Sequence, residues 1–414
     1  MQRMTTAQEQ SREMFFRGVD HFEAGRLLDA RTCFENCLAL TPERPSVHGN
    51  LGITLFHLGL PRESVAHLQK ATAGNPEHGE AWACLGLAHD ANGNWQLAID
   101  ALASALGLSD RSSALWFSKG QCLMRLGRMN EALQAFDRSV DIDPTFAAGW
   151  SARGGLLRET RQLDEAAKSF ERALAFGADP ELNSYYLASV REAKTPAAAP
   201  RQYVEALFDA YAADFQGHLV EKLGYRGYEV LLRPVIESGE RFHSALDLGC
   251  GTGLCAALIQ PSVNMIDGID ISSEMLKQAE KLGVYRELIH EDLAEFLART
   301  QRRADLVIAA DVLVYVGELS SMFLSIGRIL EPGGLFAFTV ELTTSDKDCH
   351  LLPSLRYAHS EGYVRRLAAQ CGLHCDDLRI APIRHEQSVP VQGLYVYLRK
   401  QRAVKQAERP SDHR

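Results

Sequence analysis

Five glycines recur at intervals of 34 residues through the first half of the chain. A small residue follows each glycine by twelve positions, and a large apolar residue follows four positions later. A period of this length is typical of a helix pair that stacks against copies of itself. Because one such pair cannot bury its own apolar face, the repeats predict a continuous helical solenoid. The five glycines are Gly18, Gly52, Gly86, Gly120 and Gly154.

Bulky residues precede these glycines by four positions, at Trp82, Trp116 and Trp150, and His48 is the exception in the second repeat. The pattern resembles the tetratricopeptide repeat over roughly residues 11 to 180, and residues 183 to 192 would begin a sixth repeat or a capping helix. We therefore expect a solenoid over residues 11–192. The resemblance implies a concave groove for a protein partner, although the groove could equally pack against the chain's own second domain or against a copy of the chain. Its expected apolar lining is Phe15, Val19, Phe22, Ile53, Phe56, Phe117 and Met124.

The second half of the chain begins after a Pro/Ala-rich stretch, residues 193–201, which we interpret as a stiff linker. Apolar strands then alternate with helical stretches, a pattern typical of a parallel sheet with helical crossovers. Two closing strands without a helix between them predict a hairpin with an antiparallel last strand. The expected strands are 244–248, 265–269, 286–290, 305–309, 335–340, 377–383 and 394–399. The expected helices are 253–260, 273–282, 293–302, 319–330 and 361–370.

The first of these strands runs into the turn L-D-L-G-C-G-T-G, residues 246–253. Glycines there let a ligand approach the backbone closely, because no Cβ stands in the way. In an open parallel sheet, ligands bind at the carboxyl ends of the strands, and Asp270, Asp292 and Asp311 follow the next three strands. A carboxylate such as Asp270 suits a ribose diol, which both dinucleotides and S-adenosylmethionine carry. The G-x-G-x-G spacing and the several carboxylates favour the sulfonium cofactor over a diphosphate.

Residues 202–400 resemble class I S-adenosylmethionine-dependent methyltransferases, through the glycine turn, G-I-D-I-S at 268–272, H-E-D-L at 290–293 and R-I-L-E-P-G-G-L at 328–335. The fold class implied for the whole chain is an all-α solenoid followed by a Rossmann-like, seven-stranded α/β domain. The resemblance also implies contacts with the methionine part, the ribose, the adenine and the methyl end of the cofactor. Those residues are, in that order, Asp247, Gly249 and Gly251; Asp270; Ile271, Met275, Asp292 and Leu293; and Asp311.

Catalytic candidates are Asp311, Tyr211 and His359. Residues 203–219 resemble the helical lid of small-molecule methyltransferases, with Tyr211 and Phe215 over the cofactor. The fourth strand ends in A-A-D-V-L-V-Y and lacks the Asn/Asp-Pro-Pro-aromatic turn of families that methylate planar nitrogens, which argues against adenine or glutamine as acceptor. Further residues expected on the acceptor side, as bases or as holders of an anion, are His350, Arg356, Tyr357, Arg384, His385 and Glu386, with Ser360 capping the helix that follows.

Composition limits the partners and the compartment. A net charge of -9 disfavours a nucleic-acid surface, and the longest apolar run, 306–316, is broken by Asp311 and too short for a membrane span. The N-terminus shows no signal peptide, and nine scattered cysteines are expected as free thiols in the cytoplasm. Cys371, His374 and Cys375 lack the spacing of a zinc site, so no metal is expected. The polar residues 401–414 are expected to be disordered.

These observations predict a methyltransferase that uses S-adenosyl-L-methionine and acts on a small molecule, with repeats that bind a protein partner. One alternative is a protein methyltransferase whose repeats recruit the substrate. Another is a scaffold that binds the cofactor without catalysis.

Overall fold

The structure is a computed structural model that describes residues 6–191, 195–212, 215, 225–386 and 389–402. The chain forms two compact units, Met1–Asn183 and Ser184–Arg414, each described here by itself. Part of the expected lid and most of the expected disordered tail lie outside the described residues. No helix in the described ranges is long and apolar enough to cross a membrane.

The first unit consists of helix pairs, as the 34-residue period predicts. Each pair packs a glycine of its first helix against the large residue of its second helix. A Cβ at Gly154 would stand 2.6 Å from the ring of Phe170, and the same approach recurs between Gly120 and Phe136. The helices are α1 (Thr6–Glu23), α2 (Leu27–Leu40), α3 (Pro45–His57), α4 (Pro61–Gly74), α5 (Gly79–Ala91), α6 (Trp95–Leu108), α7 (Ser113–Arg125), α8 (Met129–Ile142), α9 (Ala147–Glu159) and α10 (Leu163–Ala175), followed by α11 (Pro180–Val190), whose last residues belong to the second unit.

The second to fifth repeats also close their connecting loops through one side-chain hydrogen bond each. The indole Nε1 of Trp82, Trp116 and Trp150 donates to the carbonyl six residues earlier, at 2.9 to 3.0 Å. His48 makes the same bond, with Nε2 2.8 Å from the carbonyl of Pro42. Because a carbonyl only accepts, Nε2 of His48 carries the proton, and its Nδ1 accepts from Nδ1 of His67 at 2.9 Å. The exception in the sequence pattern therefore keeps the bond that the tryptophans make.

The second unit is built on a mostly parallel sheet in the order β3-β2-β1-β4-β5, which β9 and β8 continue in antiparallel fashion. These seven strands confirm the expected sheet and its antiparallel last strand. In the described residues the sheet has two further strands, β6 and β7, which form a hairpin that pairs with the end of β5. The strands are β1 (Phe242–Leu248), β2 (Val263–Asp270), β3 (Glu287–His290), β4 (Ala304–Ala309), β5 (Leu330–Leu342), β6 (Cys349–Leu351), β7 (Tyr357–His359), β8 (Leu373–Glu386) and β9 (Val389–Lys400).

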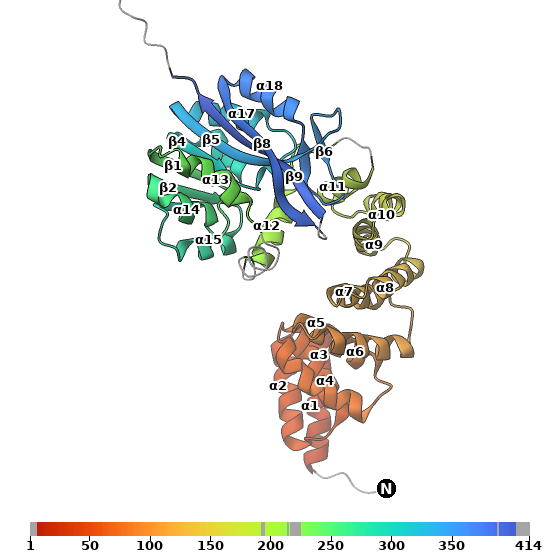
Figure 1. Ribbon diagram of the computed structural model, residues 1–414. Helices are drawn as coiled ribbons and strands as arrows, with labels where there is room; N and C mark the ends of the chain where they lie inside the picture. The colour runs from red at the N-terminus through yellow and green to blue at the C-terminus, as the bar shows by residue number, and fades with distance from the viewer. Residues whose placement is uncertain (1–5, 192–194, 213–214, 216–224, 387–388, 403–414) are drawn as a thin grey trace, which may run out of the picture. The chain divides into compact units, whose positions relative to one another are not determined.

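Helices cover both faces of this sheet (Figure 1). One apolar core joins a sheet face to α16, α17 and α18, and includes Phe323, Phe336 and Phe338. The other core joins the opposite face to α13 and α14, and includes Leu231 and Ile259. The helices of this unit are α12 (Arg201–Tyr211), α13 (Gly227–Glu237), α14 (Leu254–Ile259), α15 (Ser273–Glu280), α16 (Leu293–Arg299), α17 (Ser320–Ile329) and α18 (Glu361–Gln370), with short 3-10 turns η2 (Gln260–Ser262) and η3 (Leu313–Tyr315).

Candidate functional site

The glycine turn after β1 has the backbone conformation that its sequence requires. Gly249 and Gly251 have φ angles of 66° and 53°, in the left-handed region that favours glycine. A Cβ at Gly249 would stand 2.4 Å from Cγ2 of Val312. At Gly251 no heavy atom surrounds the Cβ position within 4 Å, so this part of the turn faces open space. The turn is therefore free to meet a ligand at Gly251.

A cavity of about 200 Å³ opens beside this turn at the carboxyl ends of the strands. The cofactor residues expected from the sequence line this cavity, except for Asp247. Its lining residues are Ala198, Ala199, Arg201, Val204, Phe208, Phe215, Gly249, Gly251, Asp270, Ile271, Met275, Asp292, Leu293, Ala294, Asp311, Val312, Tyr315 and Val316.

Asp270 at the end of β2 is held rigidly in the wall of this cavity. One carboxylate oxygen accepts from the backbone N–H of Gly251 at 2.8 Å, and the other accepts from that of Ser272 at 2.9 Å. Only 7% of the residue is exposed, and burial raises the pKa of its carboxyl above the ordinary value. Each oxygen retains further acceptor capacity, so two neighbouring hydroxyl donors match this group.

Asp247 lies behind the turn, 1% exposed, where its carboxylate accepts a hydrogen bond of 2.7 Å from the hydroxyl of Tyr285. Burial raises the pKa of Asp247 to about 7, although the Tyr285 bond favours the charged form. The structure therefore places Asp247 as a support of the turn, whereas the resemblance implied a place beside the methionine part.

Asp292 and Met275 belong to helix starts that border the cavity. Asp292 caps α16 by accepting from the N–H groups of Ala294 and Glu295, at 2.8 and 3.1 Å. Met275, 1% exposed, lies in the first turn of α15, which Ser272 caps. Both residues thus have a structural task in addition to lining the cavity.

Asp311 adopts an uncommon backbone conformation at the expected methyl end. Its φ angle is 55°, and its N–H donates to Oγ1 of Thr339 at 2.8 Å. Its carboxylate pairs with Arg384 at 3.3 Å, and Arg384 also pairs with Glu341 at 2.5 Å. Burial lowers the pKa of Arg384, but the nearby carboxylates outweigh that effect, so the guanidinium stays charged. A strained non-glycine residue held by a partly buried ion pair is a common feature of functional sites.

The other two catalytic candidates do not line the cavity. Tyr211 packs edge-on against Phe215, with ring centroids 5.5 Å apart, and Phe215 lines the cavity in its place. His359 is fully buried on β7, and its Nε2 donates to the carbonyl of Gly317 at 3.1 Å. Burial lowers the pKa of His359 to about 4. The catalytic role expected for His359 stays a prediction, and the structure places its imidazole in the core, bonded to the backbone.

The remaining residues expected on the acceptor side are dispersed. Tyr357 is buried and donates to the carbonyl of Pro196 at 2.9 Å, whereas His350 and His385 are exposed. Arg384 belongs to the buried ion pair with Asp311. Ser360 caps α18 as predicted, by accepting from the N–H of Tyr363 at 3.2 Å.

Several lining residues were not expected from the sequence. Ala198, Ala199 and Arg201 come from the stretch interpreted as a linker, and Phe208 from α12. Phe208 packs edge-on against Tyr315, with centroids 5.5 Å apart. The linker's Pro/Ala composition gave no sign of a ligand contact.

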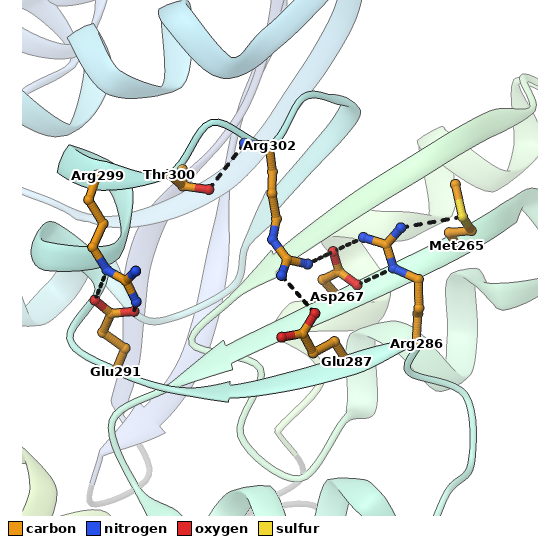
Figure 2. Close-up of polar contacts among 8 residues, drawn as sticks. All are labelled: Met265, Asp267, Arg286, Glu287, Glu291, Arg299, Thr300 and Arg302. Carbon is orange, nitrogen blue, oxygen red and sulfur yellow. Dashed lines mark hydrogen bonds and ion pairs between the residues drawn. The ribbon is translucent and has the colours of Figure 1, made fainter.

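A second polar cluster lies in the same unit and does not line the cavity (Figure 2). Asp267 of β2, 3% exposed, pairs with the guanidinium groups of Arg286 and Arg302, the latter at 2.6 Å. Arg302 also bonds Glu287 at 2.7 Å. These pairs join β2, β3 and the segment before β4, so we interpret the cluster as structural.

Comparison with known proteins assigns both units. Residues 246–338 match the family profile described as a methyltransferase domain, and three overlapping matches between residues 17 and 145 are to the tetratricopeptide repeat. The chain combines tetratricopeptide repeats with a methyltransferase domain of the S-adenosylmethionine-dependent class. The expected resemblance is thereby confirmed for both parts of the chain.

The matching relatives cover only part of the chain. A malonyl-[acyl-carrier protein] O-methyltransferase of Ilyobacter polytropus is 31% identical over 138 residues, 32% of this chain and 48% of the relative. One from Salmonella typhimurium is 27% identical, over 38% of this chain and 59% of the relative. The chain spans about half the length of these relatives. The solved N-methyltransferase NodS of Bradyrhizobium japonicum, in complex with S-adenosyl-L-homocysteine, is 17% identical with a TM-score of 0.39, over 47% of this chain and 97% of that chain.

Proposed function

We propose that this protein uses S-adenosyl-L-methionine to methylate a small molecule, and that its repeats bind a protein partner. The observation that carries the proposal is the rigid Asp270 carboxylate beside the open glycine turn. A diol fits this carboxylate because its two oxygens are fixed by Gly251 and Ser272 and still accept from outside. The space beside Gly251 leaves room for the part of a cofactor that passes the turn.

The residues of the cavity divide into a binding set and an acceptor end. Asp270 would hold the ribose, while Ile271, Met275 and Leu293 would contact the adenine. The bound cofactor supplies an activated methyl group, so the protein's main task is to align the acceptor and exclude water. Apolar Val312, Tyr315 and Phe208 suit that exclusion. Asp311, paired with Arg384, would accept the proton of an acceptor hydroxyl or amine, or balance the charge that develops on it.

A second candidate function is methylation of a protein, or of a group carried on a protein, that the repeats recruit. The match to tetratricopeptide repeats supports it, and so do the relatives named for a substrate attached to an acyl-carrier protein. In that case the repeats would contribute to substrate affinity, whereas in the first case they would serve another partner.

Calorimetry with S-adenosyl-L-homocysteine tests the cofactor assignment. Asp270→Ala should weaken binding by about 1–3 kcal/mol, because a charged group loses its hydrogen bonds to the ligand. Asp376→Ala, an exposed carboxylate of β8 outside the cavity, is the matched control and should bind like the wild type. Equal affinity of the Asp270 variant and the wild type would refute the assignment.

Transfer of a labelled methyl group tests the acceptor class. The full-length protein is incubated with methyl-labelled cofactor and a cell lysate, and macromolecular label is separated from low-mass label. Low-mass label that disappears with Asp270→Ala supports the small-molecule function. Label on protein supports the second candidate, and no label despite cofactor binding would indicate a silent scaffold.

A further inference from the structure

The linker before α12 is fixed to the edge of the cavity by main-chain hydrogen bonds. The N–H of Ala199 donates to the carbonyl of Tyr315 at 2.9 Å, and the carbonyl of Ala197 accepts from Gly317 and Glu318 at 2.8 and 2.9 Å. An antiparallel bridge pairs Ala198 with Val316. Residues 197–199 thus pair through one antiparallel bridge with the segment that follows β4.

A buried tyrosine bonds the residue before this bridge, and a second buried tyrosine packs against the helix that follows it. The hydroxyl of Tyr357 donates to the carbonyl of Pro196 at 2.9 Å. Tyr185, fully buried, donates to the carbonyl of Leu355 at 2.5 Å, and its ring lies 5.8 Å from Tyr203 in the first turn of α12. Burial raises the pKa of Tyr185 and Tyr357, so both hydroxyls stay protonated donors. The linker therefore has a fixed place.

One side of the linker forms part of the cavity wall. Ala198, Ala199 and Arg201 line the cavity, whereas Ala197, which is exposed like Ala198, does not. Arg201 pairs with Glu295 of α16 at 3.1 Å. Because Asp292 and Leu293 line the same cavity just before Glu295, the linker reaches the end expected to hold the adenine.

We propose that the linker is a cofactor-binding element, in which Ala198 and Arg201 contact the nucleoside part of the cofactor. Tyr357 is then a positioning residue, which acts through Pro196 rather than on the ligand. The inference rests on the proposed function, since it assumes that the cavity holds the cofactor. It extends the cofactor site to residues that precede the matched methyltransferase domain by more than 40 positions.

Two neighbouring alanines give a matched test. Ala198→Phe places a ring in the cavity, whereas Ala197→Phe adds the same ring one residue away, outside it. Binding of S-adenosyl-L-homocysteine and of adenosine is measured by calorimetry on the full-length protein. Ala198→Phe should weaken both ligands by at least about tenfold, because overpacking of this size opposes ligand entry. Ala197→Phe should change either affinity less than about twofold.

The outcomes separate this inference from the proposed function. If the wild type binds neither ligand, the cavity is not a cofactor site and the proposed function fails. If the wild type binds and Ala198→Phe binds equally well, the linker is not part of the site. Loss of S-adenosyl-L-homocysteine binding with adenosine unaffected would overturn the assignment to the nucleoside part.

A second comparison tests the positioning residue. Tyr357→Phe removes the bond to Pro196, and Tyr397→Phe removes an equivalent buried bond of 2.9 Å to the carbonyl of Leu231, away from the linker. Tyr357→Phe should raise the Kd for adenosine about threefold or more, while Tyr397→Phe leaves it unchanged. Equal Kd values for the two variants would contradict a positioning role for Tyr357.

Discussion

Replacing Asp247 with asparagine should stabilise the methyltransferase domain at neutral and alkaline pH. The carboxyl is 1% exposed, and burial raises its pKa from the ordinary 3.8 to about 7. The folded state therefore favours the protonated form, and folding stability declines as the pH rises from about 4 to about 7. An asparagine of the same shape carries no charge and still accepts the bond from Tyr285.

The size of the effect follows from that gap in pKa. At about 1.36 kcal/mol per pH unit, raising the pKa from 3.8 to about 7 costs the folded state about 4 kcal/mol above pH 7. An amide N–H left without a partner would offset about 1–3 kcal/mol of the gain. The variant should therefore be about 1–3 kcal/mol more stable than the wild type at pH 8, and its advantage should shrink by about 4 kcal/mol as the pH falls to 4.

Hydrogen exchange of β1 and β2 peptides, read by mass spectrometry at pH 5 and pH 8, is the suitable assay. The four tryptophans lie between residues 82 and 150, so their fluorescence reports on the repeats and not on this domain. The wild type should lose protection at the higher pH, after correction for the intrinsic exchange rate, and the variant should not. Parallel pH dependence in the two proteins would refute the reasoning.

Three further predictions concern the same domain. Gly249→Ala should destabilise it by about 2–3 kcal/mol in denaturant unfolding, because an alanine is strained at φ 66° and its Cβ meets Val312; unchanged stability would contradict the geometry. The neutral, buried His359 should lower the free energy of unfolding by up to about 3 kcal/mol as the pH falls from 6.5 towards about 4, because only the unfolded state gains a proton there. His359→Gln should therefore make the free energy of unfolding less dependent on pH in that range and leave cofactor affinity unchanged. Replacing both partners of Asp267, Arg286→Met with Arg302→Met, should lower the free energy of unfolding by about 3–5 kcal/mol, because it leaves a buried charge unpaired. Adding Asp267→Leu should restore most of that stability, and a triple variant as unstable as the double one would contradict this cause.

The sequence predicted those site residues whose position follows from strand ends. Asp270, Asp292 and Asp311 each follow a predicted parallel strand, and the carboxyl ends of such strands meet at one edge of the sheet. Local turn chemistry was equally informative at Gly249 and Gly251. Rules of this kind depend only on nearby residues, so they can be applied to the sequence alone.

The features that the sequence did not show are those that depend on contacts between distant parts of the chain. His359 looked like a base because its strand, β7, is three residues long and too short to show a pattern of burial. The linker looked inert because its role comes from main-chain bonds to Tyr315 and Gly317, which carry no side-chain signal. Asp247 stands next to the turn in sequence, but only Tyr285, 38 residues away, shows that its carboxylate faces the interior.

The hydrogen bond that His48 shares with the three tryptophans makes the repeats separately observable. The indoles of Trp82, Trp116 and Trp150 lie at the loops of their own repeats, while the second repeat carries an imidazole that emits no light. The fourth indole, Trp95, begins α6 and would be replaced first. His48→Trp would give that repeat an equivalent probe, and conversion of a single tryptophan to histidine would silence another without removing its bond. Exchanges of tryptophan and histidine at these positions would thus let tryptophan fluorescence follow the unfolding of individual repeats in one chain.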